Sequence, residues 1–306
     1  MNGRVLRLRR VSRNVGDLAR MVAFYREALA FSVVEQVCMD APGWGELMGV
    51  PGACARVARL RLGAQELELV AFDPPGAAYP AQAGASDLCF QHLAIVVADM
   101  PAAYARLGRH PFAPISLGGP QTLPANTGGV SAFKFRDPEG HPLELIHFPA
   151  GVGAPCWQAP GLFLGVDHSA IAVADAETSV DFYGRMGWRP TTRTHNRGPE
   201  QDRLDGLHGA DVDVVGLEAA QGGPPHLELL GYRMPPGNRS HPHAAGNDRV
   251  VDRLVLEVDD LQALLARLPG GAGKPVVDLD GQAMAMLKDP SGHRLLLQQE
   301  RSMAPG

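Results

Sequence analysis

Apolar and polar positions alternate along this chain in short runs, and four of the runs lead into an aspartate. They extend from Arg10 to Asp17, from His92 to Asp99, from His168 to Asp175 and from Arg253 to Asp260. Their short period and their β-branched residues are typical of strands. Because aspartate is a preferred N-cap residue, we expect a helix directly after each run. The pattern therefore predicts a strand followed by a helix at four places.

Two further motifs show that the chain is internally repeated. The pair Phe24-Tyr25 recurs as Phe182-Tyr183, 158 positions later, and the segment 136–141 recurs as 288–293, with an offset of 152. Both copies of the second segment contain Asp-Pro-x-Gly, which is typical of a type I turn and is expected to join the last two strands of a unit. The sequence predicts a βαβββ module, present four times.

Length and composition favour two domains of two modules each. The chain has 306 residues, of which 45% are hydrophobic, enough to bury substantial cores. A glycine- and proline-rich segment at 149–155 marks the boundary. We expect a first domain at 1–150, with modules at about 4–78 and 86–149, and a second at 160–306, with modules at about 163–234 and 247–302.

Charge and hydropathy indicate a small-molecule partner and a cytoplasmic location. The net charge of -5 and the pI near 6.1 give no electrostatic reason to expect a nucleic acid. No apolar run approaches the length of a membrane span, and the basic start lacks the hydrophobic block of a signal peptide. The four cysteines show no paired spacing, which favours reduced thiols. We expect a monomer or a homodimer.

Candidate chemistry lies at equivalent places in the second and third modules. His92 and His168 each open a strand, while Glu144 and Glu228 each stand between two leucines in a closing strand. Side chains alternate faces along a strand, so these glutamates point away from the leucines that flank them. His168 likewise lies on the face opposite the branched Ile171. The four polar groups are therefore expected to converge on one concave surface, where a divalent ion would balance the carboxylates.

The four strand-to-helix openings, both Phe-Tyr pairs and both Asp-Pro-x-Gly-His turns resemble the vicinal oxygen chelate superfamily, which includes glyoxalase I, extradiol dioxygenases and bleomycin-resistance proteins. The resemblance implies an α+β fold in which two modules form a curved half-barrel sheet. It also implies that the metal ligands come from the first and last strands of each module. The corresponding pairs in this chain are Arg10 and Glu68, His92 and Glu144, His168 and Glu228, and Arg253 and Leu296.

The pairing of the modules decides how many complete sites this arrangement leaves. If neighbours within each half pair, both sites lack part of the ligand set. If the second module pairs with the third and the first with the fourth, as in fused four-module glyoxalases, one site is complete and the other has no ligand quartet. We expect this second pairing. In the incomplete site, Glu68 faces Arg10 and Arg253 and could form an ion pair with them.

Two imidazoles and two carboxylates suit one divalent ion, either Mn, Fe, Co, Ni or Zn. Such an ion would act as a Lewis acid on a substrate with two adjacent oxygens, and a carboxylate would abstract a proton. The resemblance to glyoxalase I implies that Glu144 or Glu228 is this base. We therefore expect an isomerase or a lyase.

Two alternative functions remain open. An Fe(II) extradiol ring-cleaving dioxygenase needs two histidines but only one carboxylate, so the second glutamate argues against it. A non-catalytic binding or resistance protein would need no metal quartet and usually offers an aromatic trough, whereas only 6% of the residues in this chain are aromatic.

Overall fold

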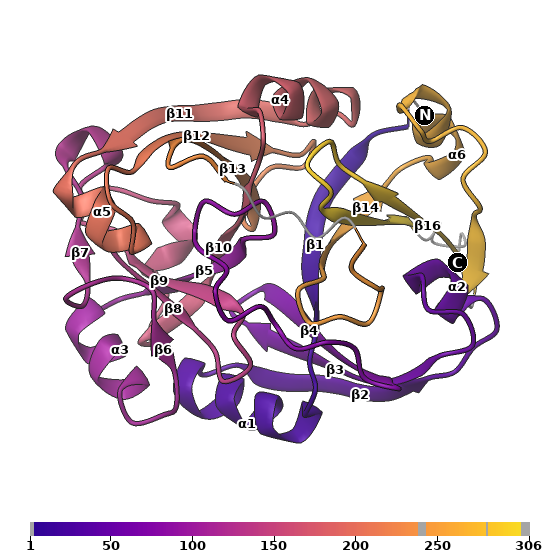
Figure 1. Cartoon of the computed structure of the whole chain (residues 1–306), viewed down its shortest axis with the longest axis horizontal. Coiled ribbons are helices and arrows are strands. Elements are labelled where there is room, and N and C mark those ends of the chain that lie inside the picture. The colour runs from indigo at the N-terminus through magenta and orange to yellow at the C-terminus, as the bar shows by residue number, and fades with distance from the viewer. Residues whose placement is uncertain (1–2, 238–242, 280, 301–306) are drawn as a thin grey trace.

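The computed structural model describes residues 3–237, 243–279 and 281–300 of the chain. Its elements follow the expected repeat (Figure 1). The first module consists of β1 (Val5–Asn14), α1 (Leu18–Leu29), β2 (Ser32–Met39), α2 (Trp44–Met48), β3 (Cys54–Leu62) and β4 (Gln65–Asp73). The second consists of β5 (Gln91–Val97), α3 (Met100–Leu107), β6 (Ala113–Pro114), β7 (Gln121–Thr122), β8 (Ser131–Arg136) and β9 (Pro142–His147), with a 3-10 turn, η1 (Ala125–Thr127), before β8.

The second half begins with another 3-10 turn, η2 (Pro155–Gln158). The third module consists of β10 (Phe163–Ala172), α4 (Ala176–Arg185), β11 (Arg189–Arg197), α5 (Pro199–Asp205), β12 (Asp211–Glu218) and β13 (His226–Met234). The fourth consists of β14 (Asp252–Val258), α6 (Leu261–Arg267), β15 (Val277–Leu279), β16 (Gln282–Lys288) and β17 (Arg294–Gln299). In the part of the chain that is described, no helix is long and apolar enough to cross a membrane.

Aspartate caps the helix that follows the first strand of every module. Asp17, Asp99, Asp175 and Asp260 each accept a hydrogen bond from the backbone N–H three residues later, at distances of 2.7 to 3.0 Å. This contact satisfies one of the donors that a helix N-terminus leaves free. The predicted start of each helix is confirmed.

The second module departs from four regular strands. Its second strand is reduced to the two short pieces β6 and β7. The intervening segment contains Gly118, Gly119 and Pro120, and Pro114 ends β6. Proline has no N–H to donate to a strand ladder and glycine packs no side chain there, which explains the interruption.

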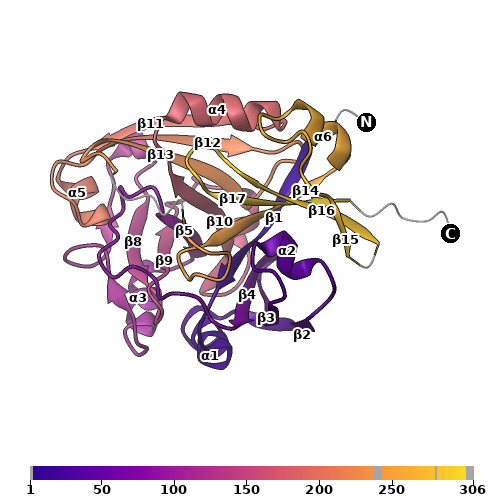
Figure 2. The same cartoon turned by 45° about the vertical axis from the view of Figure 1, so that its right-hand side comes forward.

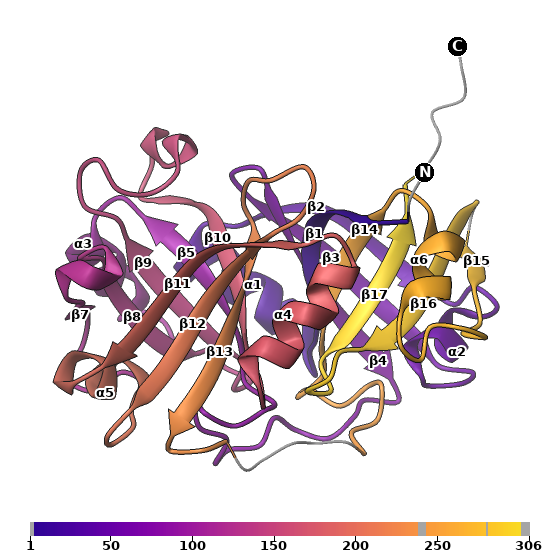
Figure 3. The ribbon, with the colours of Figure 1, turned by 90° about the horizontal axis from the view of Figure 1, so that it is seen from above.

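The modules pair across the two halves, as expected. Among the described residues, one sheet of eight strands has the order β15-β16-β17-β14-β1-β4-β3-β2, and one of nine has β11-β12-β13-β10-β5-β9-β8-β6. The antiparallel pairs β1–β14 and β5–β10 join the modules at the centre of each sheet. Figure 3 shows the two sheets side by side, with β5 next to β10 in one and β1 next to β14 in the other. The first module thus pairs with the fourth, and the second with the third.

Contacts within each half use the motifs that revealed the repeat. The Tyr25 hydroxyl donates to Asp137 at 3.0 Å, and the Tyr183 hydroxyl donates to Asp289 at 3.1 Å. In both cases the tyrosine of a Phe-Tyr pair meets the aspartate of an Asp-Pro-x-Gly turn. The helices thereby connect modules that belong to different sheets, and one apolar core cluster contains side chains from all four modules.

Arg13 lies at the centre of a buried ionic network that joins three modules. Its guanidinium lies 2.7 Å from Asp252 and 3.8 Å from Asp137, and it donates to the Tyr25 hydroxyl at 3.0 Å. The side chain is completely buried. Burial would lower the pKa of Arg13, but Asp252 and the other acidic neighbours raise it above its ordinary value. One cation therefore neutralises carboxylates from the second and the fourth modules.

The concave surface of the eight-stranded sheet is filled by side chains. Arg10 pairs with Glu68 at 3.1 Å, as expected, while Arg253 donates to Asn14 at 2.8 Å and to the carbonyl of Gly246. Leu296 packs in an apolar cluster with Trp44, which belongs to α2. Figure 2 shows α2 next to β15 and β16. This half-barrel carries an internal ion pair and an apolar cluster where the other carries histidines.

We predict that Arg13→Met lowers the free energy of unfolding by about 3–5 kcal/mol, because the buried Asp252 would lose the cation that lies 2.7 Å from it. The matched control is Arg7→Met, since Arg7 pairs with Glu257 but has a half-exposed side chain; its cost should stay below about 1 kcal/mol. Urea denaturation measures both. Equal losses in the two variants would contradict the role given to Arg13.

Candidate functional site

The central strands of the nine-stranded sheet bring the two predicted histidines together. In the antiparallel pair, Ala170 lies opposite His92 and Ala94 lies opposite His168. The two imidazoles are diagonal neighbours with ring centroids 5.5 Å apart. Alanines beside them leave space on the concave face, while Ile171 packs into the core on the other side. The histidines and Ile171 therefore lie on opposite faces of the sheet, as expected.

Three of the four predicted ligands meet closely. His92, Glu144 and His168 each offer a ligand atom within 4.8 Å of the other two, and all three residues are buried. Glu228 lies 3.4 Å from His168, measured from Oε2 to Nε2, but is outside this group of three. The structure thus places Glu228 on the same surface, somewhat apart.

The geometry of His92 fits a ligand that faces an ion. Its Nε2 lies 2.8 Å from Oε2 of Glu144. Even so, neither ring nitrogen of His92 has an aligned hydrogen-bond partner within the described residues. Two ligand atoms that hold one ion at about 2.1 Å and at right angles are separated by about 3 Å, with their lone pairs directed at the ion rather than at each other. The close approach without alignment is what a shared cation would produce.

His168 is oriented from behind by a carboxylate. Its Nδ1 lies 2.9 Å from Asp167, and Asp167 accepts a further hydrogen bond from the indole N–H of Trp157 at 3.1 Å. Histidines that bind metals commonly donate their second ring N–H to a carboxylate in this way. The contact occupies Nδ1 and leaves Nε2, which lies 3.4 Å from Glu228, as the nitrogen available to an ion.

The electrostatics of the two histidines differ when no ion is bound. Burial lowers the pKa of His92, and Glu144 offsets this only in part. Burial also acts to lower the pKa of His168, but Glu228 and Asp167 outweigh it and raise the value to about 9. Of the two histidines, His168 is therefore the one that supplies positive charge beside the carboxylates in the metal-free protein.

The two glutamates also have different surroundings. For both, burial would raise the pKa, and nearby cations and hydrogen bonds lower it below the ordinary value. The opposing contributions come first from His92 and then from Lys134 for Glu144, and from His168 and His226 for Glu228. The side chain of Glu144 is 7% exposed and that of Glu228 is 21% exposed. Glu144 is held more tightly.

A cavity of about 490 Å³ opens over these residues. One part of its wall is apolar and includes Leu123, Val130, Ile146 and Phe148. Another part is polar and is formed by Thr192, Thr194, Asn196, Gln201, Lys134 and Tyr232. The cavity could therefore take a small molecule with both apolar and hydrogen-bonding surface.

Three residues of this site were not found from the sequence. Asp167 precedes His168 and should face the opposite side of the strand, but a register shift between Val166 and His168 brings it to the cavity. Sequence alternation gives no signal for such a bulge. His226 is two positions before Glu228, so the same alternation rule could have found it. Lys134 pairs directly with Glu144 across β8 and β9 and has no motif of its own.

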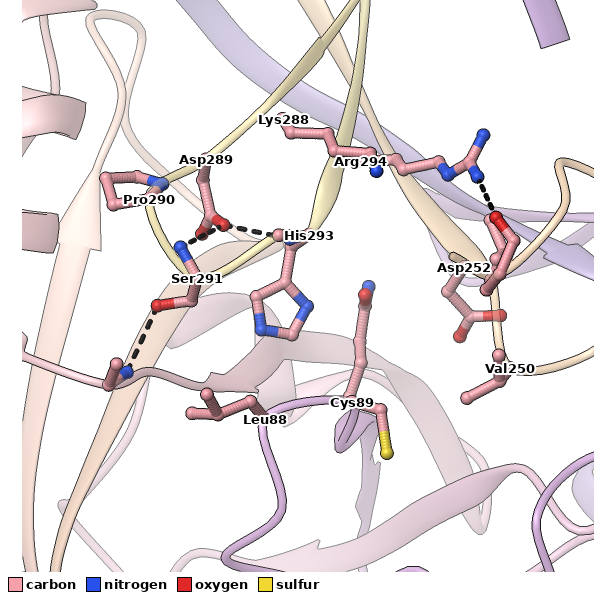
Figure 4. A pocket seen from close by; sticks show the side chains of 15 residues that line it. Leu88, Cys89, Val250, Asp252, Lys288, Asp289, Pro290, Ser291, His293 and Arg294 are labelled. Carbon is pink, nitrogen blue, oxygen red and sulfur yellow. Dashed lines mark hydrogen bonds between the residues drawn. The ribbon is translucent and has the colours of Figure 1, made fainter. Parts of the chain in front are cut away.

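A second cavity, of about 360 Å³, lies between the two halves of the chain (Figure 4). Its lining includes Cys89, Lys288, Ser291, His293 and Arg294. His293 bonds the carbonyl of Ala172 at 2.8 Å, and Arg294 bonds that of Ala244 at 2.6 Å. These two bonds join segments within the second half of the chain, and within the described residues the groups that could hold a metal ion lie in the other cavity.

Comparison with known proteins gives a family match over most of the chain. The model of the Glyoxalase/Bleomycin resistance protein/Dioxygenase superfamily matches residues 7–145 and 165–297. A 2-epi-5-epi-valiolone epimerase from Actinomyces sp. is 35% identical over 148 residues, which cover 46% of this chain and 79% of that protein.

Two solved structures are similar in fold over nearly the full chain. Glyoxalase I from Zea mays superposes with a TM-score of 0.63 at 17% identity, covering 97% of this chain and 92% of that one. A putative dioxygenase from Bacillus subtilis gives a TM-score of 0.59 at 15% identity, covering 98% and 86%. At these identities the likeness concerns the fold alone.

We predict that His168 makes the stability of the metal-free protein depend on pH. Its folded-state pKa of about 9 exceeds the ordinary 6.5, so its stabilising contribution is complete below about pH 6.5 and is lost as the pH rises through about 9. Urea denaturation in the presence of a chelator, at intervals from pH 6 to 9.5, measures this loss in the free energy of unfolding. His168→Gln should flatten the profile in this window, whereas His195→Gln, which alters a histidine outside the cavity, should not. An unchanged slope in His168→Gln would contradict the assignment.

Proposed function

The chain belongs to the Glyoxalase/Bleomycin resistance protein/Dioxygenase superfamily, and we propose that it is a divalent-metal-dependent isomerase that moves a proton on a small substrate with vicinal oxygens. The convergence of His92, Glu144 and His168 in a cavity, with the His92 nitrogens unaligned to any partner, is the observation that carries this proposal. The 35% identity to an epimerase favours isomerisation over elimination.

The proposed ion-binding residues are His92, Glu144 and His168, with Glu228 as a fourth ligand that can leave. The donor set of imidazole and carboxylate suits Mn, Fe, Co, Ni or Zn. When bound, such an ion would act as a Lewis acid toward the two adjacent oxygens of the substrate. Asp167 would hold His168 in the required orientation through its Nδ1 contact.

We assign the proton transfer to Glu228. Glu144 is fixed between His92 and the neighbouring Lys134, whereas Glu228 is more exposed to the cavity and stands outside the close group of three. The Glu228 carboxylate would take the proton from a carbon next to the carbonyl, and the bonding electron pair would move toward the carbonyl oxygen. Delivery of a solvent proton to the opposite face of that carbon, with release of the first proton from Glu228 to solvent, would complete an epimerisation with no net change in atoms or electrons.

One observation favours a second candidate function, an Fe(II) extradiol dioxygenase. Two histidines and one carboxylate are the ligand set of many non-haem iron oxygenases, and the close group of three has this composition. In that case Glu228 would face the substrate without being a ligand. Dependence on oxygen separates the two functions.

We predict about one divalent ion per folded chain. His168→Ala should lose most of the ion because it removes a ligand, while Arg10→Ala should keep it because Arg10 lies on the other sheet. Elemental analysis after dialysis against each metal in turn provides the measurement. Equal loss in the two variants, with both still folded, would refute the assignment of the site.

We also predict that the metal-loaded protein exchanges deuterium from solvent into 2-epi-5-epi-valiolone without consuming oxygen. Glu228→Gln should slow this exchange by about 100-fold or more while keeping the ion, because general-base catalysis contributes this much. Glu144→Gln should lower the metal content itself. Nuclear magnetic resonance follows the exchange, and an oxygen electrode with a catechol tests the alternative. Oxygen uptake with ring opening, without exchange at carbon, would reject the isomerase.

A further inference from the structure

A buried polar network stands beside the proposed ion-binding residues, and the proposed reaction does not use it. Asp205, at the end of α5, accepts hydrogen bonds from Lys134 at 2.7 Å, from Gln201 at 2.7 Å and from Tyr232 at 2.9 Å. Asp205 is only 2% exposed, and its three donors line the cavity. Side chains from β8, α5 and β13 are therefore held in fixed positions around one carboxylate.

A buried charged network stabilises the packing of α5 against the sheet less than apolar contacts would, because its desolvation costs free energy. Burying a lysine and an aspartate requires removing both charges from water, and apolar residues of similar volume commonly stabilise a fold as well or better. The ammonium group of Lys134 also has N–H donors that the network does not use. An ammonium group has three N–H donors, and within the described residues the ammonium of Lys134 donates to Asp205. Lys134 thus has donors to offer to a molecule in the cavity.

Another strand, β11, supplies a complementary acceptor to the polar part of the cavity wall. The Oδ1 atom of Asn196, on β11, is buried without a hydrogen-bond partner in the described part of the chain, and Asn196 lines the same cavity. Thr192 and Thr194 precede it on the same strand and also line the cavity. A buried acceptor without a partner is costly, and a ligand hydroxyl would satisfy it.

Charge indicates which ligands fit. The ammonium of Lys134 is matched by Asp205, and Glu144 and Glu228 would be matched by a divalent ion. Among the described residues that line the cavity, no excess positive charge is therefore left for a phosphate. Donors and acceptors on one wall, with apolar side chains on another, suit a ring that carries several hydroxyls and also presents C–H surface.

We propose that Lys134, positioned by Asp205, donates a hydrogen bond to an oxygen of a neutral polyhydroxylated substrate and so determines the specificity of the cavity. This inference rests on the proposed function and specifies its substrate class. Asn196 accepts from a second hydroxyl of the same molecule. Lys134 and Asn196 bind and orient the substrate, while the proton transfer remains with Glu228.

The test compares two ketones in the deuterium-exchange reaction of the metal-loaded protein. One is 2-epi-5-epi-valiolone, and the other is 2-hydroxycyclohexanone, which has the vicinal oxygens but no further hydroxyls. Lys134→Met keeps the length of the side chain and removes its donors. Because Lys134 also neighbours Glu144, the variant is judged by the ratio of KM for the first ketone to KM for the second, which should rise by about tenfold or more. Lys274→Met, at an exposed position outside this cavity, is the matched control.

A binding measurement separates the failure of this inference from the failure of the proposed reaction. Calorimetry with myo-inositol and with its monophosphate needs no turnover. Binding of myo-inositol that weakens in Lys134→Met but not in Lys274→Met supports the inference even if the protein catalyses no exchange. Equal binding by the two variants, or tighter binding of the monophosphate than of myo-inositol to the native protein, overturns it. If Lys134→Met does not fold, Asn196→Leu tests the second contact, and it should weaken binding of myo-inositol by about tenfold.

Discussion

A carboxylate buried on the concave face of a sheet must be neutralised by a cation, and this requirement applies to both sheets of the molecule. On the eight-stranded sheet, Glu68 meets the guanidinium of Arg10. On the nine-stranded sheet, Glu144 and Glu228 meet three histidines and a lysine instead. An arginine satisfies the charge permanently. A histidine does so only when protonated, which leaves its place open to a divalent ion.

The assembly of the modules makes this difference possible. Because β5 pairs with β10 and β1 pairs with β14, both histidine-bearing modules contribute to one sheet and both arginine-bearing modules to the other. The helices make contacts between the other pairs of modules. Tyr25 contacts Asp137 within the first half of the chain, and Tyr183 contacts Asp289 within the second half. Every module is thus bound to one partner through its sheet and to another through its helix. Arg13 reinforces this arrangement, because its guanidinium contacts carboxylates from two other modules.

Much of this arrangement could be predicted from the sequence, because it depends on local and periodic signals. The aspartate caps follow from the preference for a side-chain acceptor at the helix start, and the facing of His168 follows from strand alternation. The position of Asp167 could not be predicted, since it depends on a bulge that local alternation does not encode. Lys134 was also missed. Its role depends on Asp205, which is 71 residues away and meets it only when α5 packs against β8.

The two glutamates show how a duplicated module can lose its symmetry. They occupy equivalent positions in sequence, and alternation alone cannot distinguish them. The neighbouring side chains distinguish the two glutamates. Glu144 lies opposite Lys134 in a regular strand pair, whereas Glu228 shares its strand with His226, whose Nε2 lies 3.5 Å from Oε1 of Glu228. A fixed ammonium favours a carboxylate that stays charged and in place, while a partly exposed carboxylate beside an imidazole can change its position at lower cost. Proton abstraction by a metal ligand needs one carboxylate that stays on the ion and a second that can leave it. The difference between the neighbours of the two glutamates, more than the identity of the ligands, therefore distinguishes a catalytic site from a simple metal-binding site.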